Sequence, residues 1–250
     1  MDYFTIGGVS SSSFNAYIYD LNVFDSPSRS VDTYDVPGRN GTLTVAGSEK
    51  LENRELWYDM YIPKSMISNV RGLTNYLHSL KGYQRLEDTI EPDVYKKAMY
   101  VEALQLSLKT LKEAVFRVTF DCQPEKWLKS GEQKTVLVKN GSISNPTVQI
   151  SKPLIRIYGK GTVQIGSQTI EILKAPTEYI DIDCDIQDCF EGTANRNSYV
   201  SLTDFPALGP GSNGITLGTG ITKVEITPRW WTLLYLNCMN QQRWTSIAMV

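Results

Sequence analysis

The sequence predicts a mainly β protein, built of β-sandwich-like domains, with one notable helix in its N-terminal domain. Apolar and polar residues alternate along many short runs, and glycine, asparagine and proline separate these runs, which is typical of half-buried strands. A single segment follows a helical period instead. With 41% hydrophobic and 21% charged residues, the chain of 250 residues has the composition of a folded globular protein.

Strands are predicted where this alternation is most regular. In the clearest run, Phe116, Val118 and Phe120 share one face while Arg117 and Thr119 point the other way, because successive side chains of a strand face opposite sides of the sheet. The runs with this pattern are residues 16–24, 55–62, 113–121, 148–157 and 178–186.

One segment, residues 65–81, is predicted to be a helix. Its apolar residues recur at steps of three and four, which places them on one face. Ser65 is a suitable N-cap and Gly82 a suitable C-cap, whereas Gly72 weakens the helix by about 1 kcal/mol relative to alanine. The apolar face comprises Ile67, Val70, Leu73, Leu77 and Leu80.

The chain is predicted to contain two domains. A polar stretch at residues 125–133 follows a predicted strand and marks the boundary. The N-terminal domain spans residues 1–128 and holds the helix, and the C-terminal domain spans residues 134–232 and consists of strands and turns. Residues 233–250 mix apolar and amide side chains without a period, so they form a tail of unknown order.

Charge and hydropathy narrow the classes of function. Lys and Arg number 25 against 27 Asp and Glu, whereas nucleic-acid binders carry a basic surface that neutralises phosphates. The N-terminus has no basic region followed by an apolar stretch, and no run of about 18 apolar residues occurs. We therefore expect that the protein binds no sequence-specific nucleic acid and no membrane. We also expect that it is made and folded in a cytoplasm.

The four cysteines are predicted to be free thiols in a reducing compartment. Cys122, Cys184, Cys189 and Cys238 form no Cys-x-x-Cys pair, and His78 is the single histidine, so the ligand spacing of a structural zinc site is absent. A disulfide between Cys184 and Cys189 is the alternative. No metal or cofactor is expected.

Patterns that suggest catalysis or metal binding have simpler structural explanations. The aspartates at positions 181, 183, 185 and 188 resemble a calcium loop, but the sixth and twelfth places of that loop hold Ile186 and Gly192 instead of Gly and Glu. Their alternation with apolar residues predicts a strand with one solvent-facing acidic side. No Gly-x-Ser-x-Gly elbow or phosphate-binding glycine motif occurs, and His78 lies off the apolar face of the helix. No catalytic residue is therefore assigned.

The most specific segment is a tight turn at residues 37–41, made of Pro37, Gly38, Arg39, Asn40 and Gly41. Pro37-Gly38 suits a type II turn because proline fixes φ and glycine accepts a positive φ, and Asn40-Gly41 is a strong hairpin signal. Arg39 is expected to be exposed and available to a carboxylate of a neighbour. These five residues are the candidate subunit-contact or channel-side loop.

The order of several motifs resembles the distal tail proteins of siphophages, the long, non-contractile-tailed phages, that infect Gram-positive bacteria. The Pro-Gly-Arg-Asn-Gly turn comes first, and the helix is followed by a strand ending in an apolar-Cys-x-Pro motif. The resemblance covers residues 3–232 and does not extend to residues 233–250. The later motifs are Phe120–Pro124, Asn145-Pro146, Pro153, Gly159-Lys160-Gly161, Ile180-Asp181, Phe205-Pro206, the glycines of 209–214 and Pro228-Arg229-Trp230-Trp231.

This resemblance implies a structural virion protein, not an enzyme. Similar proteins form homohexameric rings at the distal end of the tail, in which the first domain surrounds a channel and the second, a galectin-like β-sandwich, projects outward. Such a hub joins the tail tube to the tail-associated fibre or lysin protein, and to receptor-binding proteins where a baseplate exists. The location implied is the virion tail tip, after assembly in the host bacterial cytoplasm.

Two other functions stay open at the level of sequence. A carbohydrate-binding adhesion module would use exposed aromatic residues, for which Trp230 and Trp231 are the candidates. Adjacent residues on a strand face opposite sides, so one of them is expected in the core and the other at an interface or a sugar-binding face. A cell-wall glycoside hydrolase would need a pair of carboxylates, which 27 acidic residues permit.

Overall fold

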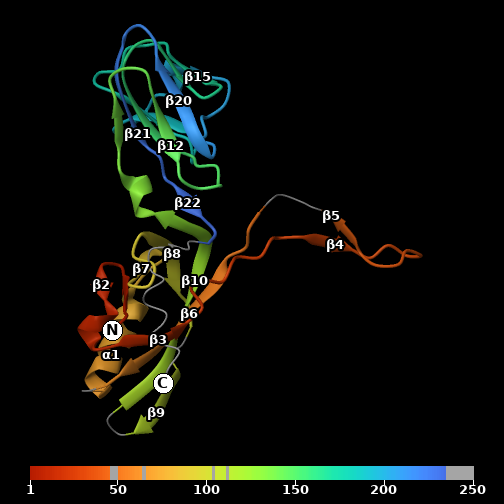
Figure 1. Ribbon diagram of the computed structural model, residues 1–250, viewed down its shortest axis with the longest axis vertical. Coiled ribbons are helices and arrows are strands. Elements are labelled where there is room, and N and C mark those ends of the chain that lie inside the picture. The colour runs from red at the N-terminus through yellow and green to blue at the C-terminus, as the bar shows by residue number, and fades with distance from the viewer. Residues whose placement is uncertain (46–49, 64–65, 103–104, 111–112, 235–250) are drawn as a thin grey trace. The chain divides into compact units, whose positions relative to one another are not determined.

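The computed structural model describes residues 1–45, 50–63, 66–102, 105–110 and 113–234 (Figure 1). Strands dominate, and α1 (Met66–Ser79) is the one α-helix of these residues, so the predicted mainly β fold with one notable helix is confirmed. The chain divides into two compact units. The first comprises Met1–Lys126 together with Leu233 and Leu234 from the end of the chain, and the second comprises Trp127–Thr232. No helix in the described ranges is long and apolar enough to cross a membrane.

The first unit is built on one antiparallel sheet in the order β2-β1-β7-β8-β10-β6-β3, with β9 paired to β10. An isolated bridge between Asp2 and Ile18 links the start of the chain to β3, so the sheet curls back toward itself. The strands are β1 (Phe4–Ile6), β2 (Val9–Ser10), β3 (Tyr17–Leu21), β6 (Arg54–Ile62), β7 (Gln84–Asp88), β8 (Val94–Tyr100), β9 (Gln105–Thr110) and β10 (Glu113–Leu128).

The pairing of β6 with β10 follows the predicted alternation. Met60 lies opposite Phe116 and Leu56 opposite Phe120, and all four face the core. The ring of Tyr58, on the same face, packs against Phe120 with ring centroids 6.2 Å apart. Burying a large apolar side chain of this kind contributes about 1.5–3 kcal/mol, so the regular alternation of these two strands accounts for much of the core.

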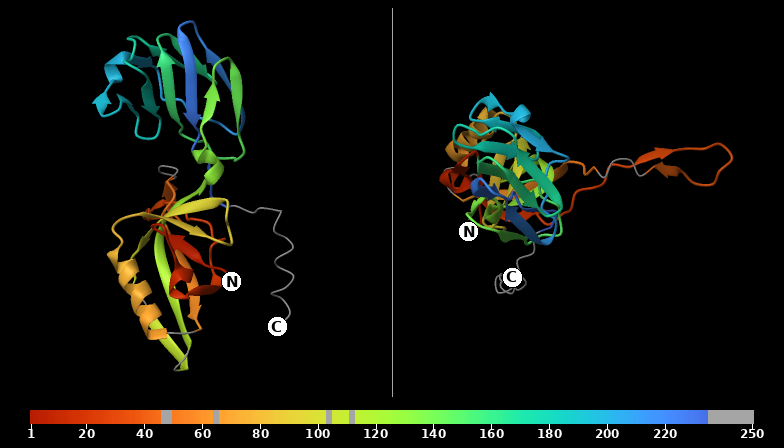
Figure 2. Two further views of the ribbon diagram at one scale, coloured as in Figure 1. Left: turned by 90° about the vertical axis from the view of Figure 1, so that its left-hand side faces the viewer. Right: turned by 90° about the horizontal axis from the view of Figure 1, so that it is seen from above.

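Helix α1 covers the core alongside the sheet (Figure 2). Leu73 and Leu77 of the predicted apolar face are buried and Val70 and Leu80 are partly buried, whereas Ile67 is 68% exposed and does not belong to the buried face. Gly72 has a packing reason that the sequence does not reveal, since a Cβ there would come within 3.0 Å of the Phe14 ring, which belongs to the short 3₁₀ helix η1 (Ser11–Phe14). The predicted N-cap, Ser65, lies outside the described residues.

Strand β10 runs further than predicted. It continues beyond residue 121 to Leu128, and the inward positions Cys122, Lys126 and Leu128 are all buried. The polar stretch 125–133 therefore begins inside a strand and is followed by the 3₁₀ helix η2 (Lys129–Glu132). The predicted strand, residues 113–121, is thus too short, and the polar composition of residues 125–128 did not reveal that these residues continue it.

The second unit is a β-sandwich of two antiparallel sheets that face each other (Figure 2). Inward isoleucines and valines of both sheets, such as Ile155, Ile182 and Val163, are fully buried. The six-stranded sheet has the order β11 (Thr135–Leu137), β21 (Ile221–Thr227), β13 (Leu154–Gly159), β16 (Ile180–Asp183), β17 (Asp188–Glu191) and β18 (Ala194–Asn195). The five-stranded sheet has the order β12 (Gly141–Asn145), β20 (Gly211–Leu217), β14 (Thr162–Ile165), β15 (Gln168–Ile172) and β19 (Val200–Leu202). The remaining elements are η3 (Asn197–Tyr199) and β22 (Trp231–Thr232).

The strand predicted at residues 148–157 is only partly correct, because β13 begins at Leu154. The Asn145 side chain accepts a hydrogen bond from the Thr147 N–H (2.9 Å) and donates one to the Gln149 carbonyl (2.8 Å). Such local side-chain bonds compete with a strand ladder. They hold the chain in a turn before the strand starts.

The predicted solvent-facing acidic side of β16 is wrong for two of its residues. Asp181 is 4% and Asp183 8% exposed. Asp181 accepts two hydrogen bonds from Arg156 (2.7 and 2.8 Å), and Asp183 accepts two from Arg229 (2.7 and 2.8 Å). Bidentate pairing offsets the cost of removing a carboxylate from water, so these acids are structural.

Candidate assembly surfaces

A two-stranded hairpin of the first unit, which we call the arm, contains the predicted tight turn. It spans residues 28–52 and is built on β4 (Asp32–Tyr34) and β5 (Leu43–Val45), which pair only with each other among the described strands (Figure 1). Hydrogen bonds from Ser30 N–H to Lys50 O and from Glu52 N–H to Ser28 O continue the ladder toward the rest of the unit. Every residue from 28 to 45 is exposed.

The predicted loop residues lie at the tip of the arm. The Arg39 N–H donates to the Val36 carbonyl (3.1 Å), and Gly38 has φ +83°, the positive value that the third residue of a type II turn requires. Asn40 and Gly41 do not form a two-residue hairpin turn of their own, because residues 35–42 together connect the strands. The Arg39 side chain has no partner among the described residues and is exposed.

The arm has one apolar face. Tyr34 lies opposite Leu43, and Asp32 lies opposite Val45, so Tyr34, Leu43 and Val45 point to the same side, together with Asp32 at its edge. These three side chains are 56%, 37% and 44% exposed. An isolated two-stranded hairpin is at best marginally stable in water unless a third strand or another surface covers it. The arm therefore has the physical character of an element that docks on a partner.

The root of the arm is fixed by a buried cluster of charges, in contrast to its tip. The Arg54 guanidinium donates to the carbonyl oxygens of Val23 (3.3 Å) and Asp25 (2.8 Å), and the Lys126 ammonium donates to the same Val23 carbonyl (2.7 Å). Glu91 accepts from Lys126 (2.8 Å). The cluster thus joins the outgoing and returning chains of the arm to β10.

The same cluster extends to a second lysine. Lys96 contacts Asp88 (2.6 Å) and Glu91 (2.9 Å), with all three side chains at most 2% exposed, and the Tyr58 hydroxyl donates to Asp88 (2.9 Å). Burial alone lowers the pKa of a lysine, but the carboxylates of Asp88 and Glu91 outweigh burial at Lys96 and raise its pKa. At Lys126 burial prevails and lowers the pKa to about 8.

The outer face of β3, β6 and β10 in the first unit is rich in aromatic side chains. The Tyr61 ring lies 5.9 Å from the Tyr17 ring and 6.5 Å from the Tyr19 ring. The Arg117 guanidinium stacks 3.8 Å above the Trp57 ring, and Tyr19 is 56% exposed. We call this set of five residues the aromatic face. Aromatic residues and arginine are the types most enriched at the centres of protein interfaces.

The two candidate tryptophans lie on opposite sides of the chain. Trp230 is 4% exposed, so it belongs to the core and is excluded as an exposed aromatic. Trp231 is partly exposed, and its indole N–H donates to the Ile150 carbonyl (2.9 Å). Only Trp231 has a ring that a partner could reach.

The histidine and cysteines, the residue types that most often serve catalysis or metal binding, are held in packed or buried positions. The His78 ring packs edge-on against Tyr100 with centroids 5.2 Å apart. Cys122, Cys184 and Cys189 are buried free thiols, and burial raises their pKa values to about 12, 12 and 11. Cys238 lies outside the described residues. Within the described ranges, no group of three or more His, Cys, Asp or Glu side chains is arranged to hold a metal ion.

Together these features define a mainly β protein of two compact units whose most accessible feature is an uncovered hairpin. The sequence matches no protein-family model and no curated protein. Among solved structures, the Dit protein (gp 19.1) of phage SPP1, described as a paradigm of the hub adsorption apparatus in phages that infect Gram-positive bacteria, has the same fold. The TM-score is 0.71 over 93% of this chain and 100% of that chain, at 13% identity. A chain of the phage P2 baseplate in its activated conformation with Ca is also similar, with a TM-score of 0.51, 10% identity, and coverage of 94% of this chain and 100% of that chain.

Proposed function

We propose that this chain is a structural subunit of the distal end of a siphophage tail, a ring-forming hub that joins the tail tube to tail-tip or baseplate proteins. The shared fold supports this proposal, because it spans 93% of the chain and the matching protein is described as a phage adsorption hub. The order of the sequence motifs along residues 3–232 supports it independently.

The arm is the observation that carries the self-assembly part of the proposal. A hairpin with Tyr34, Leu43 and Val45 exposed on one face gains stability only when another surface covers that face. The aromatic face of a second copy offers apolar rings together with the Arg117–Asp59 ion pair (2.7 Å). We infer that the arm of each copy docks on the aromatic face of the next.

A contact of this kind is head-to-tail, because the arm and the aromatic face are different surfaces of the same chain. Head-to-tail contacts close into a ring when the rotation per subunit divides the full turn. The six-fold number comes from the resemblance to distal tail proteins. In this arrangement the first unit forms the ring, the second unit, a galectin-like sandwich, extends from it, and the location is the virion tail tip after assembly in the host cytoplasm.

The proposal assigns no enzymatic activity to the chain. The buried carboxylates Asp88, Glu91, Asp181 and Asp183 are all engaged in ion pairs with lysine or arginine. A glycoside hydrolase needs two carboxyl groups that flank an open cleft, and no observation on the described residues favours that function. The tail tube and the tail-associated fibre or lysin protein are the partners that the hub would join, with receptor-binding proteins where a baseplate exists.

Substitutions on the arm test the proposal. Light scattering and negative-stain images of the full chain are expected to give a ring of six 28.2 kDa subunits. Leu43→Asp places a charge on the apolar face of the arm, and Tyr19→Asp does the same on the aromatic face. Both are expected to release monomers with an unchanged circular dichroism spectrum. Arg39→Glu tests separately whether the tip takes part in the contact.

A matched control comes from the second unit. Val148 is 80% exposed and belongs to neither surface, so Val148→Asp makes the same chemical change in the second unit and is expected to leave the ring intact. A wild-type protein that remains monomeric at micromolar concentration contradicts the ring. Rings that persist in both Leu43→Asp and Tyr19→Asp would refute the arm contact while leaving the ring itself in place.

A further inference from the structure

An asparagine followed by glycine is the sequence in which an asparagine side chain most readily reacts with its own backbone. In this reaction the backbone nitrogen after the asparagine attacks the side-chain amide carbon. Glycine offers the least resistance because it has no Cβ and adopts many backbone conformations. The side chain and the attacking N–H must also be free of hydrogen bonds. The chain contains three such pairs, Asn40-Gly41, Asn140-Gly141 and Asn213-Gly214.

The first pair lies at the tip of the arm, outside β4 and β5. Asn40 and Gly41 are exposed and belong to the connection formed by residues 35–42. Within the described part of the chain, neither the Asn40 side chain nor the Gly41 N–H makes a hydrogen bond. Gly41 has φ +77°, and no atom lies within 4 Å of the position that a Cβ would occupy. The Asn40 amide therefore reaches the Gly41 nitrogen without breaking a bond or displacing a neighbour.

The second pair is held at the start of a strand. The Leu217 N–H donates to Asn140 Oδ1 (2.9 Å), and Gly141 begins β12, where it pairs with Ile215 of β20. A Cβ on Gly141 would come within 2.9 Å of the Leu137 side chain, so the backbone here is packed as well. Asn140 is exposed, but its side chain is fixed to the neighbouring strand.

The third pair lies inside β20 and is held by more bonds than the second. Asn213 Oδ1 accepts from the Gly209 N–H (2.9 Å), and Asn213 Nδ2 donates to the carbonyl oxygens of Gly209 (2.8 Å) and Gly211 (3.0 Å). Gly214 pairs with Ser142 in the sheet. Each of these bonds stabilises the observed conformation, so all of them reduce the population of the reactive one.

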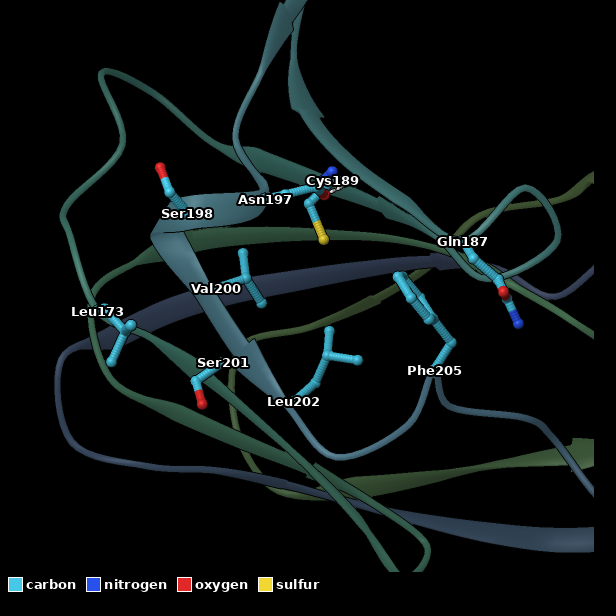
Figure 3. A pocket seen from close by; sticks show the side chains of 9 residues that line it. All are labelled: Leu173, Gln187, Cys189, Asn197, Ser198, Val200, Ser201, Leu202 and Phe205. Atoms are coloured by element: carbon cyan, nitrogen blue, oxygen red, sulfur yellow. Dashed lines mark hydrogen bonds between the residues drawn. The ribbon is translucent and has the colours of Figure 1, made fainter.

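Exposure alone does not make an asparagine side chain free, as Asn197 demonstrates. Asn197 is exposed at the margin of a hollow of about 550 Å³ on the second unit, and a small residue, Ser198, follows it (Figure 3). Asn197 Oδ1 accepts from the Cys189 N–H (2.8 Å), and its Nδ2 donates to Asp188 (2.8 Å). Both ends of this amide are occupied, in contrast to the amide of Asn40.

We propose that Asn40 is a site of spontaneous deamidation. The Gly41 nitrogen forms a bond to Asn40 Cγ while the Cγ–Nδ2 bond breaks, and Nδ2 leaves as ammonia with the proton that the Gly41 nitrogen loses. Water, the only co-reactant, then opens the cyclic imide at either carbonyl, which gives an aspartyl or an isoaspartyl residue at position 40. The new carboxylate lies beside Arg39, the only charged residue of positions 37–41, so the tip of the arm changes from cationic to neutral.

Peptide mapping by mass spectrometry tests the site during incubation of the full chain at neutral and mildly alkaline pH. Deamidation replaces an amino group with a hydroxyl group, so it changes the mass of the peptide that contains the reacting asparagine. We expect the peptide with Asn40 to convert about tenfold faster or more than those with Asn140, Asn197 or Asn213, because the loss of one or two hydrogen bonds on the way to the reactive conformation slows a reaction by about that factor. The rate should rise with pH, since the attacking nitrogen must lose its proton.

Three controls separate the structure from the sequence. In the chain unfolded by guanidinium chloride, the three Asn-Gly pairs should convert at similar rates. Gly41→Ala adds a Cβ beside the attacking nitrogen and should slow conversion at Asn40. Tyr19→Asp leaves the arm sequence intact and is expected to keep the arm uncovered, so fast conversion in this variant with slow conversion in the wild type supports the site and indicates that assembly covers it.

The proposal does not depend on ring assembly, and three results would each overturn it. The first is conversion of Asn40 in Tyr19→Asp that is no faster than conversion of Asn140. The second is a wild-type rate in Gly41→Ala. The third is an equal spread of rates among the three Asn-Gly pairs in the folded and the unfolded chain, because the spread would then come from neighbouring residues and not from hydrogen bonds of the fold.

Discussion

Replacing Glu91 with glutamine should be among the most damaging single changes in the first unit. Glu91 is 3% exposed and accepts hydrogen bonds from Lys126 (2.8 and 3.0 Å) and contacts Lys96 (2.9 Å). It and Asp88 are the two carboxylates that balance Lys96, Lys126 and Arg54 in the cluster. Glu91→Gln preserves the shape of the side chain but leaves three buried cations with one carboxylate.

The magnitude follows from the burial of the pair. Removing one partner of a buried ion pair costs about 3–5 kcal/mol, because the other charge stays in a low-dielectric site without compensation. The free energy of unfolding of a domain is only about 5–15 kcal/mol, so the substitution should remove a large fraction of it. Lys126→Met in the Glu91→Gln background removes one of the uncompensated cations, and we expect it to restore part of the loss.

Urea unfolding followed by tryptophan fluorescence measures the effect, with Asp59→Asn as the control. Asp59 pairs with Arg117, whose side chain is 49% exposed, and such surface pairs contribute about 1 kcal/mol or less. A loss of less than about 1 kcal/mol in Glu91→Gln would refute the reasoning, because it would mean that the cluster is hydrated.

The pH dependence gives the cluster a second signature. The pKa of Lys126 is about 8 in the folded chain and 10.5 ordinarily, so the unfolded chain binds more protons between these values. Stability from this group therefore rises with pH across that window and is lost as pH falls through 8. Lys126→Met should lack this rise in the free energy of unfolding. Urea unfolding at roughly pH 7.5, just below the folded pKa, and at roughly pH 9.5, well above it, measures the difference.

Two further predictions concern the second unit. Gly131→Ala should lower the melting temperature by several degrees, since a Cβ there would overlap the backbone nitrogen of Trp230 and overpacking costs about 1–3 kcal/mol, whereas Gly214→Ala, with no atom within 4 Å, serves as the control and should change little. Asp183→Asn should cost about 1.5–3 kcal/mol at neutral pH by breaking the bond to Arg229. Burial raises the pKa of Asp183, but the hydrogen bonds from Arg229 and backbone amides prevail and lower it. The wild type should therefore lose more stability than the variant as pH falls below the ordinary value of 3.8, because other carboxylates with lowered pKa values, such as Asp88, titrate in both proteins. A variant that keeps the wild-type acid dependence would contradict this.

Local patterns in the sequence were sufficient for much of the fold. The three-and-four spacing of Leu73 and Leu77 placed α1, and the alternation of Phe116 and Phe120 placed β10, because burial of one face dictates these periods. The turn at Pro37-Gly38 also followed from its residues, since backbone preference there is local.

Charge partners were beyond the reach of the sequence. Asp181 and Asp183 read as solvent-facing acids because their arginines come from positions 25 and 46 residues away. Lys126 was counted in the polar stretch at the predicted domain boundary, because its partner Glu91 lies 35 residues before it. Whether a charged side chain is buried depends on which distant segment supplies its partner, and only the register of the strands decides that.

For the candidate surfaces, too, the sequence determined some features and the tertiary structure decided others. By itself the sequence determined a mainly β chain with one helix, a tight turn at residues 37–41, and a resemblance to phage distal tail proteins. Only the tertiary structure decided that this turn caps an uncovered arm, that Trp230 is buried while Trp231 is reachable, and that hydrogen bonds hold the asparagine side chains of two of the three Asn-Gly pairs. Local conformation is set by neighbours in the chain, whereas exposure and clustering depend on contacts between segments that the sequence keeps far apart.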